Sequence, residues 1–411
     1  GVSILKQTII VKNKIIRVDL GFIAILVLLG ITSCFAIYNS FNLIKIGTGT
    51  SYLIKQIFWY GVGFFTMFIL SKIDNKIIYE YMYDAYIFLM LCLLYLFISR
   101  ITYNIIGFAL PLASPINGAI SWFQFPLIGS FQPSEFIKIV LIVLISQTIK
   151  DHQDQHENPT FKDDFLLMLQ IAKLLLPPMI LIFLQPDTGV CIIIAFCIMV
   201  LLICSGIRKV YVWILLGMIA GVIGLFLFLY FKHPETLISL ISAYRFNRIE
   251  AWLDPESNIR GSSNQLYTAL LSLGSAGLTG HGLQANIISI PEAHTDFIFA
   301  AFGQCFGLIG TTFILVVCLI LDLYLCKIAY NTTNRLDRFI VIGVIGMLLY
   351  QQLQNLGMIV GLLPITGITL PLISYGGSSI LSYFIAFSIV LNLSPISKRT
   401  IHINRPKLFK H

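Results

Sequence analysis

Apolar segments of about 20 residues recur along almost the whole chain, and they constrain its fold more than any other feature. A segment of that length crosses the hydrocarbon core of a bilayer as an α-helix. Only 11% of the 411 residues are charged, whereas an ordinary soluble domain carries about 25%. Helices are expected because a lone strand would leave backbone polar groups unpaired in lipid. We therefore predict an all-α, polytopic membrane protein.

Ten such segments can be placed by hydropathy, and no linker or low-complexity tract divides them. The predicted spans are 18–38, 52–71, 80–99, 134–149, 164–184, 187–206, 210–231, 296–325, 338–360 and 374–394. We predict a single transmembrane domain over residues 1–411, with two longer loops at about 100–133 and 232–295. The larger loop follows the seventh span.

Lys and Arg flank the spans unevenly, and this predicts the orientation of the chain. These residues resist translocation when they lie in short loops beside a span. With the N-terminus inside, most of the 27 basic residues fall on the cytoplasmic side, including the cluster from Lys398 to Lys410. We expect about ten spans, both termini in the cytoplasm and both long loops outside. The net charge of +8 comes from helix flanks and not from an aromatic-rich basic patch, which argues against nucleic-acid binding.

Four polar motifs are predicted to open helices at the outer face. They are Gln132-Pro133-Ser134-Glu135, Gln185-Pro186-Asp187-Thr188-Gly189, Pro291-Glu292-Ala293-His294-Thr295-Asp296 and Ser374-Tyr375-Gly376-Gly377-Ser378-Ser379. Helix N-termini carry unpaired N–H groups and a positive dipole pole, so several together would favour a phosphate or diphosphate. The alternative is ordinary capping, since Ser, Thr and Asp are common N-caps.

Polar side chains inside two predicted spans need partners. Glu135 and Lys138 lie one helical turn apart in an apolar run, where each charge costs on the order of 3 kcal/mol. They form either a structural ion pair or a pair that lines a polar cavity. Gln351, Gln354 and Asn355 share one face of the ninth span. Hydrogen bonds between helices are one role for these amides, and substrate contact is the other.

The larger loop contains two recognisable segments. Residues 237–252 combine an apolar stretch with Arg245, Arg248 and Trp252. They predict an amphipathic helix, either at the membrane surface or packed on the bundle as a cap. The glycine-rich run 274–282 follows no strand, so we predict a tight turn near the membrane and not a phosphate loop.

Five signatures, in the same order along the chain, resemble the RodA/FtsW/SpoVE family, the SEDS peptidoglycan glycosyltransferases. They are Asn117-Gly118-Ala119, Phe131 to Glu135, Pro186-Asp187, Pro291 to Ala300 and Pro364 to Ser379. The similarity covers nearly the whole chain, and the segment from Asn355 to Gly367 is more similar to the RodA elongation branch. The resemblance implies a ten-span protein of the bacterial inner membrane. It also implies lipid II as substrate, undecaprenyl diphosphate as product and a class B penicillin-binding protein as partner.

Asp296 matches the acidic residue of the family's HTDF motif, and the resemblance implies that it is essential. We expect it to act as general base, with arginines or a divalent cation, Mg or Mn, at the diphosphate. Asp296 is also the candidate metal ligand. A helix N-terminus would lower its pKa and burial would raise it, and simple capping of the eighth helix is the alternative role. The other candidate substrate or cavity residues are Gln132, Ser134, Glu135, Lys138, Trp122, Asp187, Arg245, Arg248, Arg260, Gln265, His294, Thr295, Asn355, Ser374, Tyr375, Gly376, Gly377, Ser378 and Ser379.

The chain departs from the family pattern in three places. Ser121 stands where an Arg usually precedes Trp122, and Gln304 and Cys305 stand where two Glu residues are common. Thr369 replaces a Pro in the run from Gly367 to Pro371. These departures bear on activity and specificity more than on the fold.

Two other functions share the same features. A flippase for the lipid-linked precursor would also place charges in the membrane, although its binding site is expected near the midplane and not at one face. A noncatalytic scaffold of an elongation or division complex would not depend on the carboxylate of Asp296.

Overall fold

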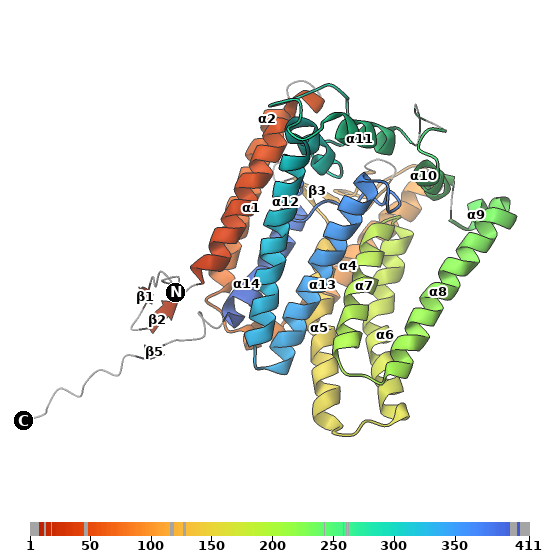
Figure 1. Ribbon diagram of the computed structural model, residues 1–411. Coiled ribbons are helices and arrows are strands. Elements are labelled where there is room, and N and C mark those ends of the chain that lie inside the picture. The colour runs from red at the N-terminus through yellow and green to blue at the C-terminus, as the bar shows by residue number, and fades with distance from the viewer. Residues whose placement is uncertain are drawn as a thin grey trace, which may run out of the picture.

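Long helices that run in alternating directions form one bundle (Figure 1). The computed structural model describes residues 8–11, 14–17, 19–44, 48–115, 119–125, 129–241, 243–257, 259, 261, 263–394 and 401–402. Side chains are described for the same residues apart from 8–11, 14–17, 243–245 and 401–402. The structure is nearly all-helical, as predicted.

Ten helices coincide with the ten predicted spans. They are α1 (Leu20–Asn39), α2 (Gly49–Leu70), α4 (Met82–Ile106), α5 (Pro133–Gln155), α6 (Phe161–Leu184), α7 (Thr188–Cys204), α8 (Lys209–Lys232), α12 (Ile298–Asn331), α13 (Arg335–Ile359) and α14 (Gly377–Leu393). Seven of them are long and apolar enough to cross a membrane, namely α1, α2, α4, α6, α8, α12 and α13. Helices α7 and α14 are apolar but have only 17 residues each. The chain is thus a multi-pass membrane protein, and the total of ten spans stays a prediction.

Shorter elements connect these helices. They are η1 (Phe41–Leu43), α3 (Asn75–Glu80), α9 (Pro234–Ile241), α10 (Ala243–Leu253), α11 (Asn264–Ser275), the hairpin of β3 (Phe123–Phe125) and β4 (Gly129–Phe131), and a sheet of β1 (Thr8–Val11), β2 (Lys14–Arg17) and β5 (Ile401–His402). Because α4 continues to Ile106, the first long loop begins later than the predicted residue 100. Strand β2 pairs with β1 and β5, so the N- and C-terminal segments lie side by side. The cytoplasmic location of both termini stays a prediction.

Hydrogen bonds between residues near the helix ends show which ends lie on the same side of the bundle. On the side of the termini, Asp19 before α1 accepts hydrogen bonds from Tyr324 of α12 and Ser394 after α14, each at 2.5 Å. Tyr79 of α3 donates to Asp337 in the first turn of α13 at 3.0 Å. The starts of α5, α7, α12 and α14 therefore lie together on the opposite side. The assignment of that side to the outer membrane face stays a prediction.

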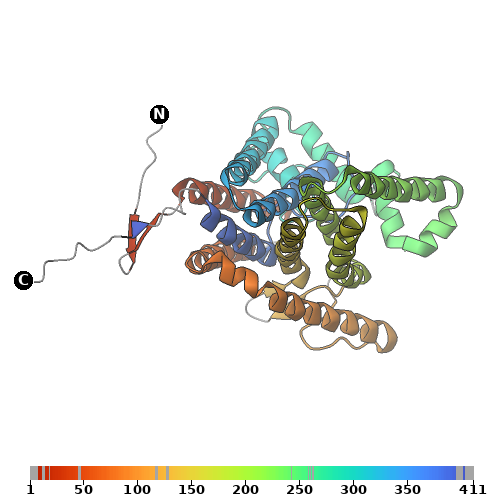
Figure 2. The same cartoon turned by 90° about the horizontal axis from the view of Figure 1, so that it is seen from below.

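Helix α14, dark blue in Figure 2, packs against α2 and α5. Its Phe384 and Phe387 are fully buried. An added Cβ on Gly63 of α2 would lie only 2.5 Å from Phe384 Cδ2, so the close approach of these helices requires glycine. Helix α8, in contrast, has no buried residue and stands apart from the bundle.

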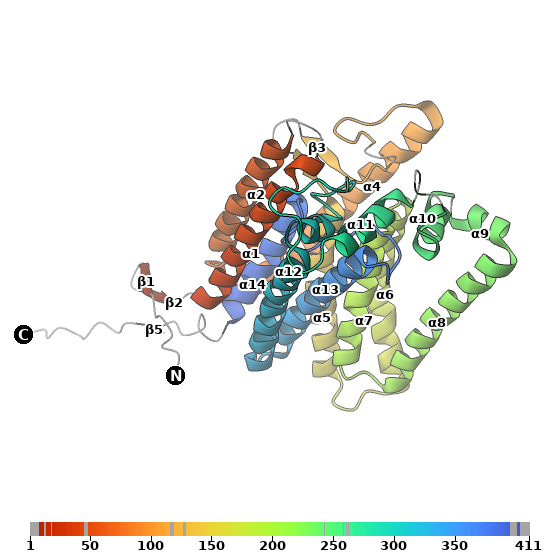
Figure 3. The same ribbon diagram turned by 45° about the horizontal axis from the view of Figure 1, so that its top comes forward.

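The larger loop folds into helices that cover one end of the bundle. Figure 3 shows α10 and α11 across the ends of α12 and α13. In α10, Phe246 and Ala251 are buried, and Trp252 Nε1 donates to the carbonyl oxygen of Gly361 at 2.9 Å. Of the two predicted placements, α10 therefore adopts the packed cap.

Candidate active site

Asp296 lies in a turn just before α12. The helix begins at Ile298 with Phe297 as its N-cap, so the alternative that Asp296 merely caps α12 is wrong. The backbone N–H groups of Thr295 and Phe297 both donate to the carbonyl oxygen of Glu292, at 3.1 and 3.2 Å. These bonds close the turn and fix the backbone on both sides of Asp296.

Asn355 of α13 holds this turn against the loop that leads to α14. Its Nδ2 donates to the backbone oxygen of Asp296 at 2.8 Å and to that of Ile368 at 2.7 Å. Gln354 Nε2 donates to the carbonyl of Pro364 at 2.9 Å. The amides of α13 thus hydrogen-bond to neighbouring segments, and Asn355 leaves the side chain of Asp296 available.

Arg248 of α10 and Asp296 both lie close to Gly367. A Cβ added to Gly367 would lie 3.3 Å from Asp296 Oδ2 and 3.5 Å from Arg248 Nη1. The φ of Gly367 is +76°, which also favours glycine. Arg248 Nη1 further donates to the carbonyl of Ile365 at 3.5 Å. A side chain at position 367 would therefore press on both the carboxylate and the guanidinium.

Burial raises the pKa of Asp296 to about 7, and this effect exceeds the lowering by Arg248. The negative charge of Glu292 adds to the rise. The sequence left open whether the pKa of Asp296 would rise or fall, and the direction is the rise expected from burial. A carboxylate with a pKa near 7 is a stronger base than an ordinary one and is still half ionised at neutral pH.

Two buried polar atoms near this turn have no hydrogen-bond partner among the described residues. They are Asn355 Oδ1 and Thr366 Oγ1. A buried polar group without a partner costs about 1–3 kcal/mol. Both atoms are therefore available to a polar ligand. Thr366 and Gly367 lie in the signature Pro364 to Ser379, but the sequence did not identify them as site residues. Their role depends on the conformation of this loop, which residue spacing does not reveal.

A second polar cluster joins the starts of α5 and α7. Trp122 Nε1 donates to Gln132 Oε1 at 3.0 Å, and Gln132 Nε2 donates to Asp187 Oδ2 at 2.7 Å. Ser134 Oγ donates to the same oxygen at 3.2 Å. Asp187 is the N-cap of α7, and burial together with nearby Glu135 raises its pKa. Four predicted site residues, Gln132, Ser134, Trp122 and Asp187, are thus in contact.

Glu135 and Lys138 form a buried ion pair on α5. Lys138 Nζ lies 3.0 Å from Glu135 Oε2, and the two residues are 2% and 6% exposed. Ser379 of α14 donates to the same oxygen at 3.0 Å. This closed arrangement favours the structural alternative, and a role in substrate binding stays a prediction.

We expect the replacement Lys138→Met to destabilise the protein by about 3–5 kcal/mol, because it leaves the Glu135 carboxylate buried without its cation. The double variant Glu135→Gln/Lys138→Met should lose much less stability, since it removes both charges. Denaturation of purified protein in detergent would measure both. Equal stability of the single and double variants would contradict a structural pair.

Contacts between loops bring the two clusters together. Ser378 Oγ accepts from the backbone N–H of Gln132 at 3.1 Å, and the N–H of Tyr375 donates to the carbonyl of His294 at 2.9 Å. A Cβ added to Gly189 in α7 would lie 2.9 Å from Ile368 Cγ1, one residue after Gly367. All four predicted helix starts therefore meet at one face of the bundle.

An aromatic group borders the turn of Asp296. The ring centroid of Tyr52 lies 4.3 Å from that of His294 and 4.8 Å from that of Tyr375. Burial lowers the pKa of His294, so its imidazole is neutral at pH 7. Tyr52 was missed because α2 has no motif at this position. His294 thus contributes ring surface and hydrogen-bonding atoms but no positive charge.

Some predicted site residues are not placed beside Asp296. The side chain of Arg245, the whole of Arg260 and the Asn117-Gly118 part of the first signature lie outside the described residues. Gln265 lies on α11, and among the described residues no contact joins its side chain to Asp296. Thr295 Oγ1 donates to Glu292 Oε2 at 2.9 Å, so it supports the turn.

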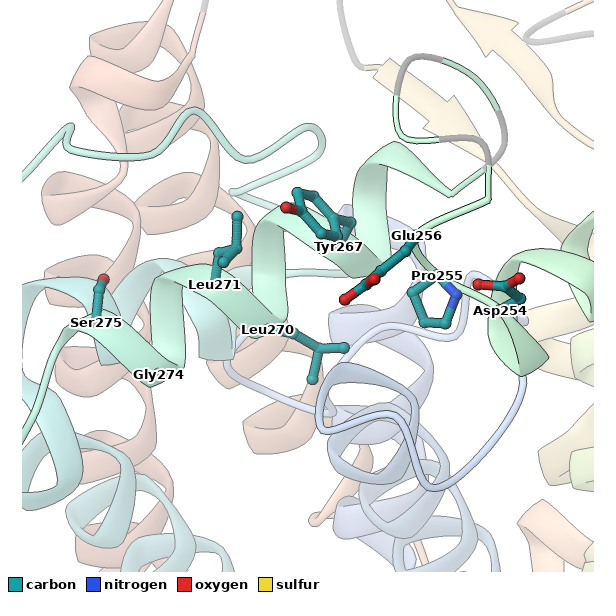
Figure 4. Close-up of a pocket in the computed structure, with 8 residues that line it drawn as sticks. All are labelled: Asp254, Pro255, Glu256, Tyr267, Leu270, Leu271, Gly274 and Ser275. Atoms are coloured by element: carbon teal, nitrogen blue, oxygen red, sulfur yellow. The ribbon is translucent and has the colours of Figure 1, made fainter.

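A separate cavity of about 460 Å³ lies beside α11 (Figure 4). Figure 4 shows Tyr267, Leu270 and Leu271 on α11, with Asp254 and Glu256 on the segment before it. Among the described residues its lining has two carboxylates and no cation, so this cavity does not suit a diphosphate. The proposed chemistry is therefore not placed in this cavity.

No group of three or more His, Cys, Asp or Glu residues that could hold a metal ion occurs in the described part of the chain. Magnesium is commonly held by only one or two carboxylates together with substrate phosphates. The partly buried Asp296 fits that limited protein contribution. The chain could therefore share a cation with a phosphorylated substrate.

Comparison with known proteins identifies the family. A family model described as "Cell cycle protein", FtsW/RodA/SpoVE, matches residues 17–399. The chain belongs to the FtsW/RodA/SpoVE family. It is 32% identical over 289 residues to Stage V sporulation protein E of Bacillus subtilis, with 69% of this chain and 73% of the relative covered. It is 30% identical to the probable peptidoglycan glycosyltransferase FtsW of Hydrogenovibrio crunogenus, with 93% and 92% covered.

Solved structures share the fold of this FtsW/RodA/SpoVE protein. A chain of "Structural coordination of polymerization and crosslinking by a peptidoglycan synthase complex" matches with a TM-score of 0.70 and 23% identity, covering 92% of this chain and 97% of the other. Thermus thermophilus rod shape determining protein RodA matches with a TM-score of 0.61 and 23% identity, covering 91% and 95%. Since sequence relatives carry FtsW and sporulation names, the RodA branch stays a prediction.

The departures from the family pattern have local structural reasons. Ser121 Oγ donates to the carbonyl of Gln185 at 2.9 Å in a buried site. Gln304 Oε1 accepts from the N–H groups of Ile287 and Ile288 at 2.9 and 2.7 Å, and its Nε2 donates to the carbonyl of Ile288 at 3.1 Å. A glutamate at this position could not donate that third bond.

Proposed function

We propose that this FtsW/RodA/SpoVE protein is a peptidoglycan glycosyltransferase that polymerises lipid II into glycan strands. The observation that supports this most is the proximity of Asp296 and Arg248 beside Gly367, at the face where four helix starts meet. One group can accept a proton there and the other can hold a diphosphate. The names of sequence relatives as probable peptidoglycan glycosyltransferases support the same reaction class.

In the proposed reaction, the 4-hydroxyl oxygen of one lipid-linked disaccharide attacks the anomeric carbon of the growing chain. The new glycosidic C–O bond forms while the bond to undecaprenyl diphosphate breaks, and the hydroxyl proton passes to the Asp296 carboxylate. Arg248 offers a planar, two-pronged partner for the phosphate oxygens of the leaving group. A diphosphate leaves as an anion once its charge is matched, so no second acid is required.

A divalent cation, Mg or Mn, belongs to the proposal as a cofactor that neutralises diphosphate charge. Asp296 is the protein ligand that could share it with the substrate oxygens. Arg248 would add positive charge from the protein. The dependence of the rate on added Mg or Mn, and its loss on chelation, tests this part separately.

A class B penicillin-binding protein is the proposed partner. A similar chain comes from a structure described by coordination of polymerization and crosslinking in a peptidoglycan synthase complex. A crosslinking transpeptidase beside a polymerase would act on each strand as it emerges. Which cell process the pair serves, elongation or division, depends on the identity of that transpeptidase.

The deciding experiment gives purified protein, with its transpeptidase partner and divalent cation, labelled lipid II in vesicles. Glycan polymer from the native chain supports the proposed function. Movement of lipid II across the vesicle membrane without polymer would favour a flippase instead. Neither polymer nor movement, with intact partner binding, would favour a scaffold.

The rate of polymerisation is expected to rise with pH through about 7 and then level off. The sign follows from the base role, because only the ionised form of Asp296 accepts a proton, and at pH 6 about a tenth of it is ionised. Initial rates at saturating lipid II between pH 5 and 9 would measure the apparent pKa. A flat profile across this range would contradict Asp296 as the base.

A further inference from the structure

Helix α12 is interrupted at Gly307, close to the turn that carries Asp296. Gly307 has φ 60° and ψ −151°, which is not a helical conformation. The residues 276–282, named here the glycine loop, follow α11 and lie against this break. The N–H groups of Leu308 and Ile309 donate to the carbonyls of Gly277 and Leu278 at 3.0 and 3.1 Å.

The glycine loop also donates hydrogen bonds to the other side of the break. The N–H groups of His281 and Gly282 donate to the carbonyls of Gln304 and Cys305 at 2.9 and 3.0 Å. The loop therefore pairs four backbone groups that an unbroken helix would pair internally. Backbone N–H and C=O groups near a membrane require hydrogen-bond partners. The break at Gly307 is therefore stable only while the glycine loop supplies these partners.

Only glycine fits at the point of closest approach. A Cβ added to Gly280 would lie 2.3 Å from the carbonyl oxygen of Cys305, and one added to Gly307 would lie 2.6 Å from the backbone nitrogen of Gly280. Both residues have positive φ, +75° and +60°. Because the opposing atoms belong to the backbone, a side chain there must displace the main chain.

The short helical segment between Asp296 and the break is held along its length. Residues 298–306 span about 13 Å as a helix. At the end near the break, Gln304 bonds to Ile287 and Ile288, and Cys305 is fully buried. At the other end, Asn355 holds the backbone of Asp296. The position of this one short helix therefore links the break at Gly307 to the turn that carries the carboxylate.

We infer that the glycine loop, through its contact with Gly307, positions Asp296 for reaction, which makes Gly280 and Gly307 positioning residues. This inference rests on the proposed polymerase function. A misplacement of about 1 Å far from the reacting atoms can lower a rate about 100-fold. The loop therefore sets the rate of the chemical step without contacting the substrate.

The test compares Gly280→Ala with Gly206→Ala in the full chain with its transpeptidase, on labelled lipid II. Gly206 has φ +74° but nothing within 4 Å of an added Cβ, so it reproduces the backbone strain without the collision. We expect Gly280→Ala to lower kcat about 10- to 100-fold with little change in KM. Gly206→Ala should keep the native kcat and KM.

Several outcomes would overturn the inference. A native kcat in Gly280→Ala would do so. A loss of rate that Gly206→Ala matches, or that comes from a higher KM with a native kcat, would also overturn it. If Gly280→Ala does not fold, the variant Gln304→Met replaces it in the test. Gln304→Met removes the hydrogen bonds that hold residues 298–306 near the break but introduces no collision with the backbone. It should lower kcat in the same way. Native kcat in that variant also overturns the inference. Failure of the native chain to make polymer would instead overturn the proposed function.

Discussion

Replacement of Asp296 by Asn is expected to reduce glycan polymerisation by at least 100-fold, the lower end of what a positioned general base contributes, about 10²–10⁴. Asn has the same shape but cannot accept the hydroxyl proton. The fold around it should remain, since the bond from Asn355 uses the backbone oxygen of Asp296 and not its side chain. The effect is measured by comparing the initial rates at which the native protein and the Asp296→Asn variant consume labelled lipid II.

Glu292→Gln is the matched control for this prediction, because it removes a neighbouring, exposed carboxylate from the same turn. It should keep most of the activity. Because the charge of Glu292 helps to raise the pKa of Asp296, its loss should shift the rate profile toward lower pH. Polymer formation by Asp296→Asn at the native rate would remove Asp296 from the base role. If Glu292→Gln lost all polymerisation activity while Asp296→Asn did not, Glu292 would be the better candidate for the general base.

Arg248→Ala is expected to lower the rate of polymerisation by about 10²–10³, the range seen when one donor to a developing anion is removed. Arg248 lies beside Gly367 with Asp296, and its charge acts on that carboxylate. Its removal should also raise the pKa of Asp296, since its charge lowers that pKa, and the rate profile should move toward higher pH. Arg248→Lys should retain part of the rate, because Lys keeps the charge but loses the two-pronged geometry.

Lys232→Ala provides a control for general electrostatics at the same side of the bundle, since Lys232 is an exposed cation at the end of α8. Its rate should match the native rate. Full activity in Arg248→Ala would mean that Arg245, Arg260 or a divalent cation supplies the positive charge. Steady-state kinetics over a range of lipid II and Mg concentrations would separate these sources.

The positions of the long helices could be predicted from the sequence because each helix depends on the hydropathy of its own residues. A run of about 20 apolar residues forms a helix in lipid whatever its neighbours are, and ten such runs coincide with ten helices. The helix starts at Gln132, Asp187 and Gly376 were predictable for a related reason, since Pro, Asp and Gly mark such ends. Asp296 and Arg248 were both named in advance as well.

The partners of these residues were not predictable from spacing. Glu135 and Lys138 were visible as a pair, but only the packing of α14 shows that Ser379 completes a closed, buried group. The glycine-rich run 274–282 indicated a turn, yet nothing in its composition shows that it lies against a break in α12 at Gly307. Each of these contacts joins residues distant in the chain.

The sequence by itself determined that this protein is a membrane-embedded helical bundle of the FtsW/RodA/SpoVE type, with its polar motifs at one face. Hydropathy and the residue preferences of helix ends depend on only a few neighbouring residues. The helices and their ends can therefore be predicted from the sequence. The tertiary structure decided that Asp296 and Arg248 both lie beside Gly367 and that burial raises the pKa of that carboxylate. Both depend on how loops from different parts of the chain pack together, and desolvation arises only when that packing removes water.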